Sequence, residues 1–210
     1  MSQTINYKNG DRYSGDVQNN KRDGMGTYFF KSGNKYIGSW LNDRKHGPGI
    51  FSFTNGDRYG ATWQNGEQRG GKCVYFYANG DKHEGEMLNS KPNGRGVYYY
   101  ENGNGYDGEW KDGMQTGIGL YHYASGGEYF GGWLNDKRHG TGKLDCSSGN
   151  GYEGNWVNDK RQGKGMEYLA NGDRYVGDWK DNKKNGKGVY YYVNGTKVEG
   201  VWVDDTKQGL

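Results

Sequence analysis

Four histidines and a set of carboxylates, such as the adjacent Asp204 and Asp205, are the side chains of this chain with catalytic potential. Histidine beside a carboxylate can act as a general acid or base, and a nucleophile within reach would complete a hydrolytic triad. No such set recurs at triad-like spacing. His46 and His139 occupy equivalent places in a repeated pattern but are too far apart in the chain to share a metal ion. We therefore predict a protein that is not an enzyme and that needs no metal or other cofactor.

The glycine motifs offer no phosphate chemistry either. A phosphate-binding loop has the form G-x-x-x-x-G-K-[ST] and leads into a helix, and neither feature occurs here. Gly47-Pro48-Gly49 instead completes a phrase that begins at Tyr36-Ile37-Gly38-Ser39-Trp40. This phrase reads Y-x-G-x-W, a polar turn, then G-x-G. All seven tryptophans of the chain occupy its W position, so the motif is a structural repeat.

The repeat has a period of 23 residues, with one step of 24 between Tyr59 and His83. Residues 1–4 form a leader in this interpretation, and 5–210 form one repeat array with a half unit at each end. The eight full units begin at Tyr13, Tyr36, Tyr59, His83, Tyr106, Tyr129, Tyr152 and Tyr175. The extra residue falls between Trp63 and Gly71, where we expect it to lengthen a turn.

Within each unit the apolar residues alternate with a period of two, which is typical of β-strands. Asn-Gly or Ser-Gly pairs such as Asn55-Gly56 close the units and accept the positive φ of a turn. The fold class that follows is all-β: a single elongated, twisted antiparallel sheet of consecutive β-hairpins without notable helices. Glycines within the strands leave room for Tyr and Trp rings to lie flat on neighbouring strands.

Composition supports an ordered array with a thin aromatic core. Glycine contributes 41 of 210 residues and tyrosine 20, while the mean hydropathy is −1.20. Unpatterned, such a chain would be disordered, but the periodic aromatics argue against disorder. The net charge of +3, from 28 basic and 25 acidic residues, gives no case for nucleic-acid binding. The two cysteines lie at different repeat positions, which favours a reducing compartment over a disulfide framework.

Two surfaces are candidate binding sites. The first is an aromatic groove that would bind an extended or helical protein segment, unless its rings serve only as scaffold. Its predicted residues are Trp40, Phe51, Phe53, Trp63, Tyr75, Tyr77, Tyr98, Tyr100, Trp110, Tyr121, Tyr123, Trp133, Trp156 and Trp179. Residues 59–105 are the least regular units, where Ala61 and Cys73 replace glycines and Met87 replaces Trp. Selectivity for a partner would lie here, and a bend or drift in a tolerant repeat are the competing interpretations.

The second candidate is a row of basic pairs at one recurring turn. Its members are Lys21, Arg22, Arg44, Lys45, Lys137, Arg138, Lys160, Arg161, Lys183 and Lys184. A cationic row attracts anionic phospholipid headgroups, each charge contributing about 1 kcal/mol near an anionic membrane surface. Aspartates beside these pairs weaken the field, so an ordinary solvated turn is the competing interpretation.

The repeated phrase resembles the MORN repeat (membrane occupation and recognition nexus). Lys45-His46-Gly47-Pro48-Gly49 and Arg138-His139-Gly140-Thr141-Gly142 are close instances, and the resemblance covers essentially residues 5–209. It implies a scaffold or adaptor, since such repeats occur in radial-spoke heads of cilia, junctional membrane complexes, parasite division structures and myosin adaptors. Some members are assigned phospholipid binding, and others bind protein, often as a helix laid along the sheet.

The expected function is therefore a non-catalytic scaffold in the cytoplasm, in a cytoskeletal or ciliary assembly. Its partner would be a protein segment, or a second copy joined through open sheet edges. The alternative is a peripheral module on the cytoplasmic membrane face that binds anionic lipid through the basic turns.

Overall fold

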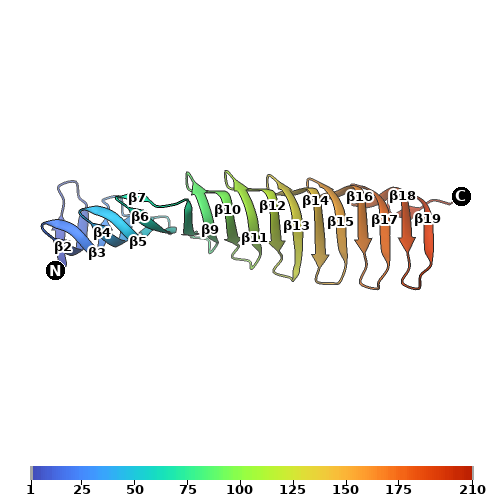
Figure 1. Ribbon diagram of the computed structural model, residues 1–210, viewed down its shortest axis with the longest axis horizontal. Coiled ribbons are helices and arrows are strands. Elements are labelled where there is room, and N and C mark those ends of the chain that lie inside the picture. The colour runs from blue at the N-terminus through green and yellow to red at the C-terminus, as the bar shows by residue number, and fades with distance from the viewer. Residues whose placement is uncertain (1, 210) are drawn as a thin grey trace. The chain divides into compact units, whose positions relative to one another are not determined.

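The computed structural model describes residues 2–209, and all regular elements among them are β-strands. The chain divides into two compact units, Met1–Glu101 (unit 1) and Asn102–Leu210 (unit 2). Within each unit, strands that are consecutive in the chain lie side by side (Figure 1). The predicted all-β array of consecutive antiparallel hairpins is confirmed in both units.

Unit 1 contains ten strands, in which each pairs antiparallel with the next except at β7, where β6 pairs with both β7 and β8. The strands are β1 Ser2–Asn6, β2 Arg12–Gln18, β3 Lys21–Phe29, β4 Lys35–Leu41, β5 Arg44–Ser52, β6 Arg58–Gln64, β7 Glu67–Gln68, β8 Lys72–Phe76, β9 Lys82–Leu88 and β10 Lys91–Tyr99.

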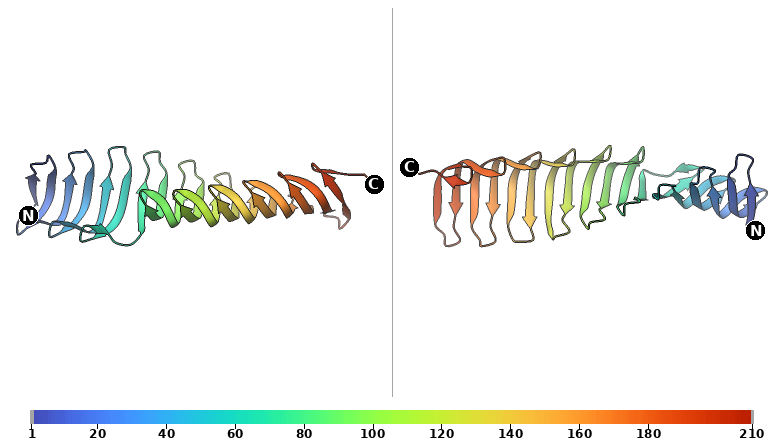
Figure 2. Two further views of the ribbon diagram at one scale, coloured as in Figure 1. Left: turned by 90° about the horizontal axis from the view of Figure 1, so that it is seen from above. Right: turned by 180° about the vertical axis from the view of Figure 1, so that it is seen from behind.

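Unit 2 repeats this arrangement more regularly, with unbroken antiparallel pairing along the chain. Its connections alternate between the two ends of the strands (Figure 2). The strands are β11 Gly105–Lys111, β12 Met114–His122, β13 Gly127–Leu134, β14 Lys137–Cys146, β15 Gly151–Val157, β16 Lys160–Tyr168, β17 Arg174–Lys180, β18 Lys183–Tyr191, β19 Lys197–Val203 and β20 Thr206–Lys207.

The tight turns follow the tryptophan position. Between β4 and β5, Asn42 has φ 48° and Asp43 has φ 67°. Positive φ at both central residues defines a type I′ turn, whose twist matches that of the flanking strands, and Asn and Asp tolerate this conformation. The Asn-Gly pairs form longer loops. In the loop after β5 only Gly56 has positive φ, and the Phe53 amide donates to the Asp57 carbonyl at 2.9 Å.

The two glycines of G-x-G have different tasks. Gly47 has φ 73° and belongs to a β-bulge, where the register of β4 and β5 shifts between Gly38 and Trp40. Gly49 lies beneath the Tyr36 ring, so that a Cβ at this position would collide with the ring. One glycine therefore permits a backbone conformation and the other permits close packing.

The two faces of each sheet differ. In β4 the side chains of Tyr36 and Trp40 are buried, whereas Ile37 is exposed. Since β5 pairs Phe51 with Tyr36 and Ile50 with Ile37, aromatic rings gather on one face, here called the ring face. Aliphatic and charged residues, with separate aromatic rings such as Phe29 and Phe130, occupy the other, here called the opposite face. The core of each unit is the layer of rings on the ring face.

Two local features differ from the sequence-based expectation. The extra residue of the third repeat lies after a normal two-residue turn at Asn65 and Gly66, and it splits the second strand of the hairpin into β7 and β8. Residues 2–4, which we expected to belong to a leader, are part of β1 and pair with β2. Met1 lies outside the described residues.

Candidate functional site

A ladder of tyrosine and tryptophan rings forms the base of the ring face. The Tyr36 ring covers Gly38 and Gly49, and burial raises its pKa to about 12, which keeps the phenol neutral. Trp40 does not lie flat as expected: its ring stands edge-on to Tyr36, at 89° and 5.3 Å between centroids. Its Nε1 donates to the Gly26 carbonyl at 3.3 Å. This edge-to-face packing stabilises the ladder beyond simple burial.

The tryptophans predicted to line a groove lie mostly inside this ladder. Their exposed fractions are between 2% and 7%, except for Trp63, which is half-buried. The buried members are Trp40, Trp110, Trp133, Trp156 and Trp179. These rings support the surface of the ring face from beneath and offer little area of their own.

A second layer of rings lies above the ladder in unit 1 and is here called the aromatic strip. Neighbouring centroids along it are 4.6–6.3 Å apart, without a gap. Eight of the nine rings are half-buried, and Tyr75 is buried. The strip consists of Tyr7, Tyr28, Phe30, Phe51, Phe53, Tyr75, Tyr77, Tyr98 and Tyr100.

Six strip residues are among those predicted for the groove, and the structure brings them together: Phe51, Phe53, Tyr75, Tyr77, Tyr98 and Tyr100. The sequence prediction missed Tyr7, Tyr28 and Phe30, although the 23-residue period marks the same positions there. In unit 2, Tyr121 and Tyr123 pack together at 4.8 Å. The next ring positions hold Leu144, Cys146, Glu167 and Leu169 instead.

Aspartates after the Asn-Gly pairs fix several strip rings, an arrangement here called the carboxylate clamp. Asp81 accepts hydrogen bonds from the Tyr98 hydroxyl and from the Glu101 amide, both at 2.8 Å. The same clamp occurs at Asp11, Asp57 and Asp173. Asn34 holds the corresponding place opposite Phe51, which has no hydroxyl, and keeps only the backbone bond, from the Thr54 amide at 3.0 Å.

Each clamp shifts the pKa values of both its carboxylate and its phenol. The backbone amide of Val193 lowers the pKa of Asp173 against the opposing effect of desolvation, with help from Asn171 and Tyr190. Burial, followed by the bond to Asp173, raises the pKa of Tyr190 to about 12. Each clamp therefore joins an ionised carboxylate to a neutral phenol in the next repeat, which ties consecutive repeats together.

The basic pairs divide into two kinds of residue. The first members are exposed: Lys21, Arg44, Lys137, Lys160 and Lys183. The second members lie on the ring face over aromatic rings: Arg22, Lys45, Arg138, Arg161 and Lys184. Arg22 is typical, since its Cζ is 4.2 Å from the Trp40 centroid and its Nε is 3.1 Å from the Asp43 carboxylate. Half of the predicted cationic row is thus engaged within the protein.

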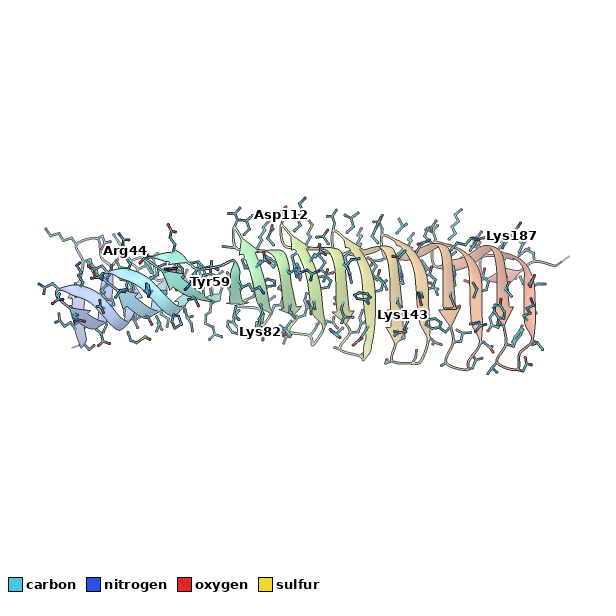
Figure 3. All side chains as sticks on the ribbon, in the orientation of Figure 1. Arg44, Tyr59, Lys82, Asp112, Lys143 and Lys187 are labelled. Atoms are coloured by element: carbon cyan, nitrogen blue, oxygen red, sulfur yellow. The ribbon has the colours of Figure 1, made fainter. Side chains whose placement is uncertain are left out.

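The opposite face of unit 2 carries an open groove of about 1010 Å³. Its floor is backbone, at glycines such as Gly165 and Gly177, and its apolar walls include Ile118, Phe130 and Val201, which are exposed by 49–59%. Lys143 and Lys187, labelled in Figure 3, also line it. The sequence prediction missed this groove: its floor consists of repeated glycines, and its walls occupy the variable positions beside them.

The remaining candidates for chemistry are scattered. Within residues 2–209 no cluster of three or more His, Cys, Asp or Glu side chains could hold a metal ion. No helix in this range is long and apolar enough to cross a membrane. His83 takes the place of a ladder tyrosine and is fully buried, and desolvation lowers its pKa despite the contact of its Nε2 with the Glu86 carbonyl.

Comparison with known proteins identifies the repeat. A family model described as the MORN repeat matches eight consecutive segments, residues 13–35, 36–58, 62–82, 83–105, 106–128, 129–151, 152–174 and 175–197. No curated protein matches the chain.

Several solved structures share features of the fold at low identity. The wild-type TCP10 domain of Danio rerio CPAP is 11% identical with a TM-score of 0.55, covering 98% of this chain and 100% of that chain. A mutant of that domain is 9% identical with a TM-score of 0.52, covering 95% and 99%. The TCP domain of Drosophila melanogaster SAS-4, bound to a proline-rich motif of Ana2, is 16% identical, with a TM-score of 0.47 and coverage of 73% and 83%. The likeness to the two Danio rerio domains concerns the fold alone.

Proposed function

The chain belongs to the MORN repeat family, and from this premise we propose that it is a non-catalytic scaffold that binds a segment of another protein along the aromatic strip. The observation that carries the proposal is the unbroken contact of nine rings, eight of them only half-buried, on one face of unit 1. Tyrosine and phenylalanine supply large contact area at low cost in side-chain entropy and are enriched at protein interfaces.

The clamps and the ladder prepare this surface for binding. Tyr75 and Tyr98 are held by Asp57 and Asp81, each through a 2.8 Å hydrogen bond, so these rings lose little freedom when a partner covers them. Binding to a preorganised surface retains more of the contact energy. Because the strip runs across the strands, a partner in extended or helical form would contact several repeats at once.

Variants on the two faces of unit 1 test the proposal. Replacing Phe53, Tyr77 and Tyr100 with serine removes three of the nine strip rings. The matched control replaces the exposed Ile37 and Ile50 of the opposite face with serine. We expect a cross-linked partner to be retained by the wild type and the control and lost from the strip variant, with unchanged circular dichroism. Equal retention by all three proteins would refute strip binding.

The cellular setting is proposed from family resemblance alone. MORN arrays of this size resemble radial-spoke-head components, which supports a cytoplasmic scaffold in a cytoskeletal or ciliary assembly. A second copy of the chain is the other candidate partner, because a strand at a sheet edge can pair with another chain. Light scattering of the purified chain distinguishes self-association from capture of a different protein.

Anionic lipid is the second candidate ligand, supported by the five exposed first members of the basic pairs. Two of these, Lys160 and Lys183, have carboxylates within 2.9 and 3.5 Å, which reduces the available charge. Sedimentation with phosphatidylserine vesicles at low and at physiological salt tests this function. Glutamine at Lys21, Arg44 and Lys137 should abolish binding if the exposed row carries it, and absence of wild-type binding at both salt concentrations excludes it.

A further inference from the structure

The ring face of unit 2 contains a cavity of about 230 Å³, here called the notch. It is lined by Arg138, Leu144, Tyr152, Trp156, Arg161 and Glu167, with Cys146 at its mouth. These residues belong to β14, β15 and β16, and the neighbouring turns add Asn150, Asp159 and Asn182 to the lining.

Missing rings account for the notch. At the position of Leu144, other repeats of unit 2 place a tyrosine against the ladder tryptophan: Tyr121 lies 5.7 Å from Trp133 at 33°, and Tyr190 lies 6.3 Å from Trp202 at 33°. Leu144 leaves Trp156 without this ring, and Cys146 and Glu167 replace two more rings of the repeat pattern. The cavity therefore occupies space that aromatic side chains fill elsewhere in the same sheet.

The charged side chains around the notch are held in ion pairs, three cations with two carboxylates. Arg138 lies 4.3 Å from the Trp156 centroid and is paired with Asp159 at 3.1 Å. Arg161 lies 5.5 Å from the Tyr152 centroid and is paired with Glu167 at 2.7 Å. Lys184 is 2.9 Å from the second Glu167 oxygen. Because each guanidinium already has a carboxylate, the notch favours a neutral guest over an anion.

We propose that the notch binds the tyrosine side chain of a partner segment. The phenol ring would take the place that tyrosines occupy over the other ladder tryptophans, beside the two guanidinium groups, which interact favourably with an aromatic face. One Glu167 oxygen accepts a hydrogen bond from Arg161 and the other is paired with Lys184, and a carboxylate can accept more, so it can receive the phenol hydroxyl. The clamps show the same pairing of phenol and carboxylate at 2.8–3.0 Å.

This inference deepens the proposed scaffold function and rests on it only for the source of the ring, a protein partner. The notch itself can be tested without that partner. The probe is N-acetyl-tyrosine amide, titrated into the full chain with ¹³C-labelled leucine methyl groups. The Leu144 methyls should show an upfield ring-current shift that saturates, and Leu41, on the exposed surface of unit 1, should not shift.

Related probes and one variant sharpen the test. N-acetyl-phenylalanine amide, which lacks the hydroxyl, should bind about fivefold more weakly, the loss expected for one hydrogen bond. N-acetyl-leucine amide should give no saturating shift. In Cys146→Phe the notch is filled by the ring found at the equivalent Phe30, the exposed position tolerates the change, and the Leu144 shift should disappear.

The opposite results would overturn the proposal. They are no saturating Leu144 shift with the tyrosine probe, an equal response to the leucine probe, or an unchanged response in Cys146→Phe. The scaffold function is tested with variants of unit 1 and a protein partner, whereas the notch is tested with a small probe. Failure of the first test therefore does not decide the second. If the probe titration saturates but no protein partner is captured, the notch is a site for a free phenolic molecule. This result would contradict a protein source of the ring.

Discussion

Substitutions can remove the carboxylate clamp at one repeat and introduce it at another. Tyr98→Phe deletes only the hydroxyl that donates to Asp81 at 2.8 Å. The reverse change is available within the same unit, where Asn34 stands opposite Phe51. Asn34→Asp combined with Phe51→Tyr should create a clamp like that of Asp81. Deletion and construction together test whether the pairing stabilises contacts between repeats.

The expected magnitude follows from the exposure of the pair. A hydrogen bond to a charged group contributes roughly 1.5–3 kcal/mol to stability, and an ordinary one about 1 kcal/mol. Since the side chains of Asp81 and Tyr98 are only half-buried, we expect the lower value. Tyr98→Phe should therefore lower the free energy of unfolding by about 1 kcal/mol, which corresponds to about 4 °C in melting temperature for a unit of this size.

Hydrogen exchange is the suitable assay, because long repeat arrays need not unfold in a single two-state step. The Glu101 amide donates to Asp81 at 2.8 Å and reports the local opening of the clamp. In Tyr98→Phe its exchange should be about fivefold faster. Asn34→Asp and Phe51→Tyr should each have little effect alone, while the double variant should slow exchange of the Thr54 amide by a similar factor.

The pH dependence has a defined sign. Desolvation raises the pKa of Asp81, but the hydrogen bonds from Glu101, Tyr98 and Asn79 outweigh it, and the pKa is lowered overall. The stabilisation is therefore complete above the unfolded-state pKa of about 3.9 and is lost as the pH falls through the folded-state value. The difference between wild type and Tyr98→Phe should shrink below about pH 4. At pH 7, the double variant Asn34→Asp/Phe51→Tyr should slow exchange by more than the sum of its single variants. Effects that simply add, in free energy, would refute the clamp.

Three further predictions concern the ladder. His83→Tyr should restore the tyrosine of the ladder. Because burial lowers the pKa of His83 in the folded state, the wild type should lose stability as the pH falls below about 6.5, and the variant should not. The melting temperature measured across this pH range tests the prediction. Gly49→Ala should destabilise unit 1 by more than 2 kcal/mol, roughly the cost of overpacking a core, whereas Gly60→Ala, with its nearest contact at 3.7 Å, should be tolerated; urea denaturation distinguishes them. Arg138→Met should lower the melting temperature and Lys137→Met should not, since only Arg138 lies over a ring and is paired with a carboxylate.

The repeat period was sufficient to predict the strands and the ring face. Tyr36, Gly38 and Trp40 alternate with polar or aliphatic residues, so a period of two places them on one side of β4. The turn types were less accessible, because Asn42-Asp43 and Asn55-Gly56 are both good turn formers. Only the backbone shows that the first pair makes the tight turn, with positive φ at both residues.

The candidate surfaces were predictable only in part. The period identifies Phe53 and Tyr77 as equivalent, but not that their rings lie above the ladder while Trp40 lies within it. Adjacent bases such as Lys21 and Arg22 cannot be distinguished by type, since strand geometry decides which of them faces the rings. The walls of the opposite-face groove occupy positions that vary between repeats, and its repeated glycines were interpreted only as room for the rings of the other face. That a partner covers the aromatic strip stays a prediction.

Photo-cross-linking from defined positions tests strip binding most directly. Benzoylphenylalanine in place of Tyr77 puts a photoreactive ring in the strip, and the same group in place of Ile50 puts it on the opposite face of the same unit. We predict covalent capture of one protein segment from position 77, mapped by mass spectrometry, and none from position 50. Capture of a partner from position 50 and none from position 77 would contradict the account.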